Sequence, residues 1–98
     1  MNSFYILQIS VKDPVKLKEY TDVAPTTIVP FSGELVFRGK VSDILSGKPE
    51  HTAAVVIKFP DQSSAKDWYE SEEYQSLIEN RDSAAKVIVA RYDNPDFF

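Results

Sequence analysis

Hydrophobic and polar residues follow two rhythms along the 98-residue chain. Four stretches alternate loosely and are rich in β-branched and aromatic residues, which is typical of half-buried strands. The predicted strands lie at 4–11, within 32–40, at 52–59 and at 84–92. Between the first two strands, and again between the last two, apolar residues recur every three or four positions, as on one face of a helix.

The predicted order of elements is β-α-β-β-α-β, the split βαβ or ferredoxin-like pattern. We therefore expect an α+β fold, with one four-stranded antiparallel sheet and two helical segments on one of its faces. The chain has no repeat, low-complexity tract or linker. Residues 1–98 are then a single domain, in which 93–98 is a C-terminal tail. The tail is either disordered or docked on a partner chain, and its two terminal phenylalanines favour docking.

The predicted helix ends rest on capping residues. Asp13 can cap the first helix and Pro14 suits its first position, where the missing N–H costs nothing. We expect Pro25 to end or kink this helix. The following residues to Phe31 form either a short helical turn or an extended link. Asp61 is a candidate cap for the second helical segment.

The apolar rhythm changes inside the second helical segment. Tyr69 and Tyr74 are five residues apart, a step that one straight helix would not keep on a single face. A joint at Ser71 restores the spacing, with Ser71 capping a new helix and two glutamates in its first turn. Consecutive glutamates point apart on a helix, which argues against a paired-carboxylate catalytic site. Arg81 then shares a face with Tyr74, and it either stabilises a helix end or reaches into a cavity and binds an anion.

Strict alternation also assigns each strand residue to one of two faces. The face turned away from the helices would carry a contiguous apolar patch, made by Phe4, Ile6, Val36, Ala54 and Val56. Such patches usually mark interfaces, and a second copy packed sheet against sheet would bury this one in a symmetric homodimer. The alternative is a solvated sheet with a few exposed aliphatic residues.

The same alternation places Gln8, Glu34 and Arg38 on that outer face. Inside a dimer they would be polar groups in a protected lumen. Glu34 and Arg38, four residues apart on one strand, then either form an ion pair that fixes the register of the dimer or each bind a ligand.

The amino-acid composition argues against several classes of function. The chain has no cysteine, which excludes disulfides and thiolate catalysis and fits a reducing compartment. The net charge of −4, without a basic stripe, argues against nucleic acid as a partner. The N-terminus resembles a strand rather than a signal peptide, and no window approaches the ~20 apolar residues of a membrane span. By elimination we expect a cytoplasmic protein without membrane contact.

Candidate chemistry is sparse. His51 is the only histidine, so it is either a surface residue or a general base. No spacing of ligands predicts a metal site. Tyr20, Trp68 and Tyr74 are either core aromatics or the wall of a pocket.

The string "IKFPDQSSAKDWYESEEYQSLIENRDSA", together with "SGELVFRGK", resembles domain of unknown function 1330. The shared pattern includes Trp68-Tyr69, Ser71, Arg81 and an Arg38-Gly39 pair after Gly33, whereas Glu34 stands where the pattern usually has a second glycine. The resemblance covers nearly all of the chain to Tyr92. It implies a ferredoxin-like fold that pairs as a dimeric α/β barrel. The wider superfamily includes cofactor-free monooxygenases, muconolactone isomerases and heme-handling proteins.

Two hypotheses follow. In the first, a homodimer binds a small, partly apolar or anionic molecule without a cofactor, in a pocket between sheet and helices lined by Tyr20, Arg38, Trp68, Tyr74 and Arg81. A catalytic version is cofactor-independent oxidation or proton transfer, with His51 or Glu34 as the base and Arg38 as the oxyanion partner. In the second, the protein is a non-catalytic binding or assembly module, and the same polar residues hold the dimer together.

Overall fold

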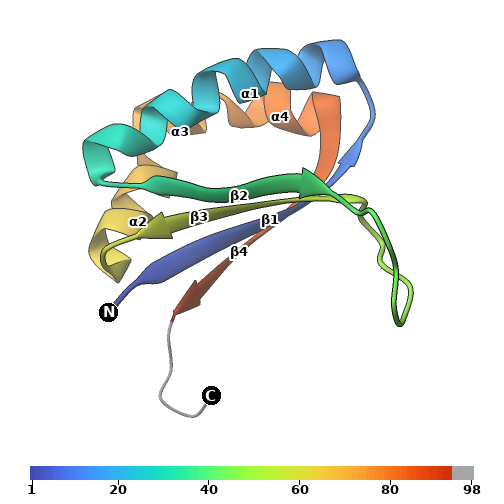
Figure 1. Ribbon diagram of the computed structural model, residues 1–98. Helices are drawn as coiled ribbons and strands as arrows, with labels where there is room; N and C mark the ends of the chain where they lie inside the picture. The colour runs from blue at the N-terminus through green and yellow to red at the C-terminus, as the bar shows by residue number, and fades with distance from the viewer. Residues whose placement is uncertain (94–98) are drawn as a thin grey trace.

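The sheet and its helices form two layers, as seen in a computed structural model that describes residues 1–93 (Figure 1). The predicted docking of the tail concerns residues outside this range. All helices of the described part lie on one face of the sheet. The elements are β1 (Ser3–Val11), α1 (Pro14–Ile28), the 3₁₀ turn η1 (Val29–Phe31), β2 (Glu34–Lys40), β3 (Ala53–Phe59), α2 (Gln62–Glu70), α3 (Glu72–Gln75), α4 (Ile78–Ala84) and β4 (Ala85–Asp93).

The strand order is β2-β3-β1-β4, and every neighbouring pair is antiparallel. This confirms the ferredoxin-like α+β fold. Alternate residues of β1 point towards the helices, so Tyr5, Leu7 and Ile9 are buried against them. Phe59 and Trp68 complete the centre of the core and are almost inaccessible to water. Each such side chain stabilises the fold by about 1.5–3 kcal/mol through the apolar surface that it removes from water.

The first helix begins as predicted but ends later. The Asp13 carboxylate accepts hydrogen bonds from the amides of Val15 (3.1 Å) and Lys16 (3.2 Å). Of the two outcomes expected at Pro25, an end or a kink, the end is ruled out, because α1 runs through Pro25 to Ile28 and continues as η1. A proline inside a helix removes one backbone hydrogen bond, and the contacts of the last turn with α2, described below, outweigh that loss.

The predicted joint at Ser71 is confirmed. The α2 helix ends at Glu70, and the Ser71 hydroxyl accepts a hydrogen bond from the Tyr74 amide (3.3 Å) at the start of α3. Glu72 and Glu73 lie in the first turn of α3, where acidic residues interact favourably with the helix dipole. A second break before Ile78, which the sequence analysis did not predict, separates α3 from α4.

A β-bulge in β2 changes the face on which its residues lie. Leu35 pairs with Ile57 on the helix side, but the next pairings are Phe37 with Val56 and Arg38 with Val55, so that Val36 is an extra residue. The assignment of Arg38 to the outer face is therefore wrong, and Phe37 lies on the outer face opposite Val56. Glu34 does lie on the outer face, opposite Lys58. Arg38 and Glu34 cannot form the expected ion pair, because the sheet separates them.

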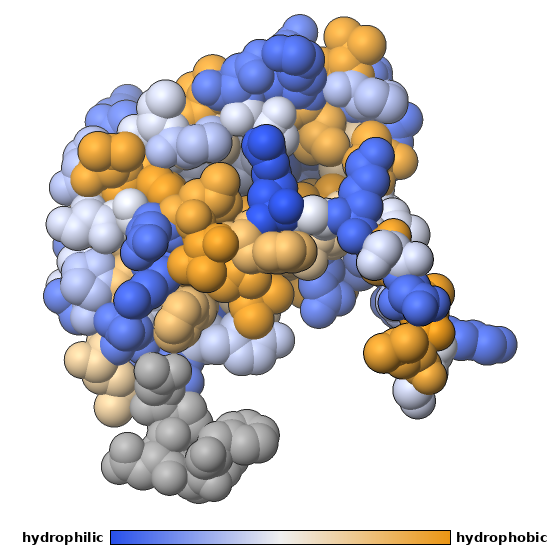
Figure 2. Space-filling view, viewed as in Figure 1, coloured by the Kyte–Doolittle hydropathy of each residue, from blue (hydrophilic) through white to orange (hydrophobic). Residues whose placement is uncertain are grey.

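The connection between β2 and β3 projects from the end of the sheet (Figure 1). Ile44 and Leu45 expose 55% and 90% of their surfaces there, and Figure 2 shows hydrophobic atoms near the tip of this projection. None of the helices in residues 1–93 is both long and apolar enough to span a bilayer.

Candidate functional site

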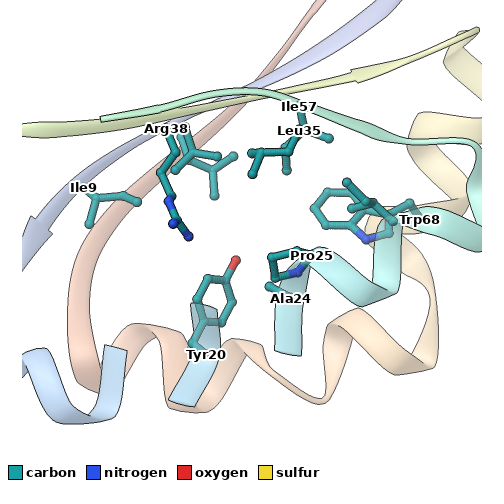
Figure 3. A pocket seen from close by; sticks show the side chains of 11 residues that line it. Ile9, Tyr20, Ala24, Pro25, Leu35, Arg38, Ile57 and Trp68 are labelled. Atoms are coloured by element: carbon teal, nitrogen blue, oxygen red, sulfur yellow. The ribbon is translucent and has the colours of Figure 1, made fainter. Parts of the chain in front are cut away.

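A small pocket lies between the inner face of the sheet and helix α1 (Figure 3). Its volume is about 50 Å³, several times what one water molecule requires. The walls are almost entirely apolar. Eleven residues line the pocket, namely Leu7, Ile9, Tyr20, Ala24, Pro25, Ile28, Leu35, Arg38, Val55, Ile57 and Trp68.

Small side chains on α1 leave this space open. Ala24 and Pro25 face the sheet where larger residues would fill the gap (Figure 3). Trp68 closes the far end of the pocket and is held in place, because its indole Nε1 donates a hydrogen bond to the Thr27 hydroxyl at 2.9 Å. The deep end of the pocket is therefore rigid and apolar.

Arg38 is the only charged residue among the eleven. The bulge in β2 turns its side chain towards the helices, and Figure 3 shows the guanidinium extending from the sheet towards Tyr20. Arg38 also lines an adjoining groove of about 270 Å³, which shares Ile9 and Val55 with the pocket. Because Arg38 is exposed to solvent, it stands at the mouth of the pocket, between the groove and the apolar interior.

Tyr20 provides the second polar group of the pocket. Its hydroxyl lies 2.7 Å from that of Tyr74, which in turn accepts a hydrogen bond of 3.0 Å from Arg81. Tyr74 and Arg81 do not line the pocket, so the prediction that both contact a ligand there is not supported by their positions. They lie directly behind Tyr20 and reach the pocket only through it.

The Arg81 guanidinium is buried and donates three hydrogen bonds. It donates to Asp82 (3.0 Å), to Tyr69 (3.3 Å) and to Tyr74. Burial alone would lower the pKa of Arg81, but the hydrogen bonds to Tyr69, Asp82 and Tyr74 hold it above the ordinary value. The positive charge is thus permanent, and its Nη1 atom donates to two tyrosine oxygens.

Burial also raises the pKa of both tyrosines in this chain of hydrogen bonds. For Tyr20 the neighbouring Tyr74 adds to the effect of burial. For Tyr74 burial outweighs the opposing hydrogen bonds with Tyr20 and Arg81. Both hydroxyls therefore stay protonated at neutral pH, so neither tyrosine can act as a base.

His51 and Glu34 lie on the other side of the sheet. The His51 imidazole is buried, and its Nδ1 lies 2.9 Å from the Ser10 hydroxyl. It lines a groove on the outer face with Gln8 and Phe37. The expected combination of either residue with Arg38 in one catalytic site is wrong, because the sheet stands between them. No cluster of three or more potential metal ligands occurs within residues 1–93.

The sequence analysis missed the apolar half of the pocket. Ala24, Pro25 and Leu35 were not singled out, because small and aliphatic residues have no distinctive pattern. One signal was present for Arg38: three consecutive apolar residues, Leu35 to Phe37, interrupt the alternation of β2, as a bulge does.

The sequence matches the model of one protein family over residues 2–92, a domain of unknown function, DUF1330. The chain belongs to the DUF1330 family. The resemblance noted from the sequence is thereby confirmed. Among curated proteins, none is similar enough in sequence to match this chain.

Solved structures show where the DUF1330 chain stands among known folds. A dimeric ferredoxin-like protein of unknown function from Jannaschia sp. CCS1 superposes with a TM-score of 0.71 at 8% identity, covering 96% of this chain and 100% of its own. A dabb family protein with a ferredoxin-like fold from Mesorhizobium loti gives 0.66 at 12% identity, covering 96% and 97%. SnoaB, a cofactor-independent oxygenase from Streptomyces nogalater, gives 0.67 at 7% identity, covering 97% and 94%. At these identities the likeness establishes the fold of dimeric α/β-barrel proteins and nothing more.

Proposed function

We propose that this DUF1330 protein is a homodimer that binds a small, largely apolar molecule with one anionic group, in the pocket between sheet and helices. One observation carries the proposal. The pocket is apolar on nearly every side and holds a single charged side chain, Arg38, at its mouth. Ligand sites commonly combine an apolar lining with a few polar groups that fix orientation.

The position of Arg38 supports an anionic group rather than a neutral one. A guanidinium has five N–H donors and accepts no hydrogen bond, and it binds carboxylates in a two-pronged geometry. Across residues 1–93, no salt bridge or hydrogen bond engages the side chain of Arg38. An anion at the mouth of the pocket would supply that partner, while its apolar part lies against Ala24 and Trp68.

A reaction in this pocket remains a prediction. Its lining contains no carboxylate and no imidazole, so His51 and Glu34 cannot supply a base there. SnoaB is described as a cofactor-independent oxygenase. Such an oxidation, or an isomerisation, would need in this pocket a substrate that loses its proton without a neighbouring base. Binding requires no such condition, and we propose binding as the function.

The homodimer is proposed from the outer face of the sheet. Phe4, Ile6 and Val56 lie on this face, and Phe37, Ile88 and Tyr92 join them at its edges, each about half exposed. A contiguous apolar face of this kind usually marks an interface. A second copy placed sheet against sheet would cover it, and the Jannaschia protein of the same fold is described as dimeric.

A thermal-shift panel tests the binding proposal. We expect small carboxylates with apolar tails to raise the melting temperature more than the amides of the same shape. Arg38→Met should abolish that difference, whereas Lys66→Met, at an exposed position on α2, should preserve it. Ala24→Val should reduce the response to carboxylates and amides alike, because it fills the pocket. A panel in which no compound raises the melting temperature would refute the proposal.

Sedimentation tests the dimer separately. We expect the wild-type protein to sediment as a dimer at micromolar concentration and Ile88→Lys to shift it towards monomer. Val15→Lys changes a residue on α1 that is 74% exposed and should leave the dimer intact. A well-folded wild-type monomer at that concentration would disprove the assembly.

A further inference from the structure

The hydroxyl protons of Tyr74 and Tyr20 can be placed by counting donors and acceptors. A guanidinium only donates, so the bond of 3.0 Å between Arg81 and Tyr74 uses the Tyr74 oxygen as acceptor. A hydroxyl has one proton to donate and can accept twice. The other hydrogen bond of the Tyr74 hydroxyl within residues 1–93 is the one to Tyr20, at 2.7 Å.

Burial decides the direction of the bond between the two tyrosines. Tyr74 has no accessible surface, so water cannot accept its proton. If Tyr20 donated to Tyr74, the proton of Tyr74 would be buried without an acceptor, which costs about 1–3 kcal/mol. In the opposite direction the unpartnered proton is that of Tyr20, which lines the pocket, where a water molecule or a ligand can accept it. Tyr74 therefore donates to Tyr20, and the Tyr20 oxygen is an acceptor in this bond.

The proton of Tyr20 is then free to donate elsewhere. Tyr20 lines the pocket, and Figure 3 shows its hydroxyl directed into the space that Arg38 enters from the sheet. Among the described residues the Tyr20 hydroxyl has no hydrogen bond besides the one to Tyr74. Two donors, one neutral and one cationic, thus face the same part of the pocket from opposite walls.

We propose that the Tyr20 hydroxyl and the Arg38 guanidinium bind the two oxygens of a carboxylate whose apolar tail fills the pocket, and that Tyr74 and Arg81 are positioning residues that aim the Tyr20 proton at it. The inference rests on the proposed function and specifies its ligand class: a monocarboxylate with an apolar tail. The raised pKa of Tyr20, due to burial and to Tyr74, keeps this hydroxyl a donor at neutral pH. The charge of Arg81, relayed by Tyr74, strengthens it as a donor, because hydrogen bonds in a chain polarise one another.

The test compares butanoate with butanamide, which share a short tail suited to a pocket of about 50 Å³ and differ in charge. Binding of each is measured by NMR titration of the full-length protein, and folding of every variant is checked by its amide spectrum. We expect wild type to prefer butanoate by at least tenfold. Tyr20→Phe should reduce this preference severalfold and leave the affinity for butanamide nearly unchanged.

The positioning role is tested by a matched pair of variants. Tyr74→Phe removes the hydroxyl between Arg81 and Tyr20, and it should reduce the butanoate preference about threefold. Tyr69→Phe removes another hydroxyl bound by Arg81, at 3.3 Å, which the structure does not connect to Tyr20. It should leave the preference unchanged. Equal losses in both variants would show a general effect of the cluster and overturn the relay.

The outcomes separate this inference from the proposed function. If both probes bind and Arg38→Met abolishes the preference, but Tyr20→Phe has no effect, the pocket is a site and the two-donor proposal is wrong. If neither probe binds the wild-type protein, both proposals are wrong.

Discussion

The indole Nε1 of Trp68 lies 2.9 Å from the hydroxyl oxygen of Thr27, and both side chains are buried. The bond joins α2 to the last turn of α1, beyond Pro25. Thr27 also donates to the Ala24 carbonyl at 2.6 Å. Thr27 therefore satisfies the donor of Trp68 and anchors the part of α1 that forms one wall of the pocket.

Thr27→Val should destabilise the protein by about 1–3 kcal/mol, because it leaves the buried indole N–H without an acceptor while keeping the shape of the side chain. Urea unfolding measures the change in the free energy of unfolding. Thr26→Val is the control, since Thr26 makes the same type of bond to a backbone carbonyl on the same helix, at 2.6 Å, but is exposed. The control should change stability by no more than about 0.5 kcal/mol. Equal losses would mean that the indole bond contributes nothing.

Gly33 lies where no larger residue fits. A Cβ atom at this position would stand 2.7 Å from the Cβ of Ile28 and 2.8 Å from a ring carbon of Phe59, which is fully buried. Gly33→Ala should therefore cost about 1–3 kcal/mol through overpacking. At Gly39 the added atom would meet only the ring of Phe37, which is 53% exposed and free to move. Gly39→Ala should cost less, and a reversed order in urea unfolding would contradict the packing seen around Gly33.

The fold could be predicted from the sequence because its signals are local. Alternation defined the four strands, and the step of five from Tyr69 to Tyr74 located the joint at Ser71. The spacing of seven also placed Arg81 beside Tyr74, which the bond of 3.0 Å confirms. Each of these inferences relates residues close in the chain, whose geometry the helix or strand period determines.

The site could be predicted only in part, because its geometry depends on contacts between distant residues. Tyr20 and Tyr74 are 54 residues apart, and no pattern in a single sequence relates them. The face of Arg38 depends on one extra residue in β2, and a shift of one position exchanges the two faces of a strand. Pro25 illustrates a third cause. A proline locally favours the end of a helix, but the packing of the last turn of α1 against α2 overrides that preference.

Ser71→Ala should destabilise the protein by about 1 kcal/mol, within the usual range for loss of a helix N-cap. The Ser71 hydroxyl accepts from the Tyr74 amide and also donates to the Trp68 carbonyl at 2.6 Å, so it connects α2 to α3. Ser71→Asp keeps an acceptor at the cap and should recover part of the loss. Ser83→Ala, which removes an exposed hydroxyl from α4, is the control. Urea unfolding that shows no difference between the two alanine variants would rule out the capping role.

Alkaline pH should unfold the protein through its buried tyrosines. Burial raises the pKa of Tyr5 from the ordinary 10.0 to about 12, and its hydroxyl donates to the Ala65 carbonyl at 3.0 Å. A group whose pKa is higher in the folded state contributes stability that is complete below the unfolded pKa. Above that pH the unfolded state loses the proton first, so the free energy of unfolding should fall between about pH 10 and pH 12. Tyr20 and Tyr74 shift in the same direction and add to the loss.

Tyr5→Phe isolates one titrating group in this transition. At neutral pH the variant should be less stable by about 1 kcal/mol, since the hydrogen bond to Ala65 is lost. Its stability should then decline less steeply with pH than that of wild type, because one tyrosine no longer ionises in the unfolded state. Thr27→Val, which lowers stability without removing a titrating group, is the control and should follow the wild-type slope. The midpoint of urea unfolding, measured at intervals through this pH range, gives the dependence of stability on pH for each protein. Parallel curves for wild type and Tyr5→Phe would show that Tyr5 does not contribute to alkaline unfolding.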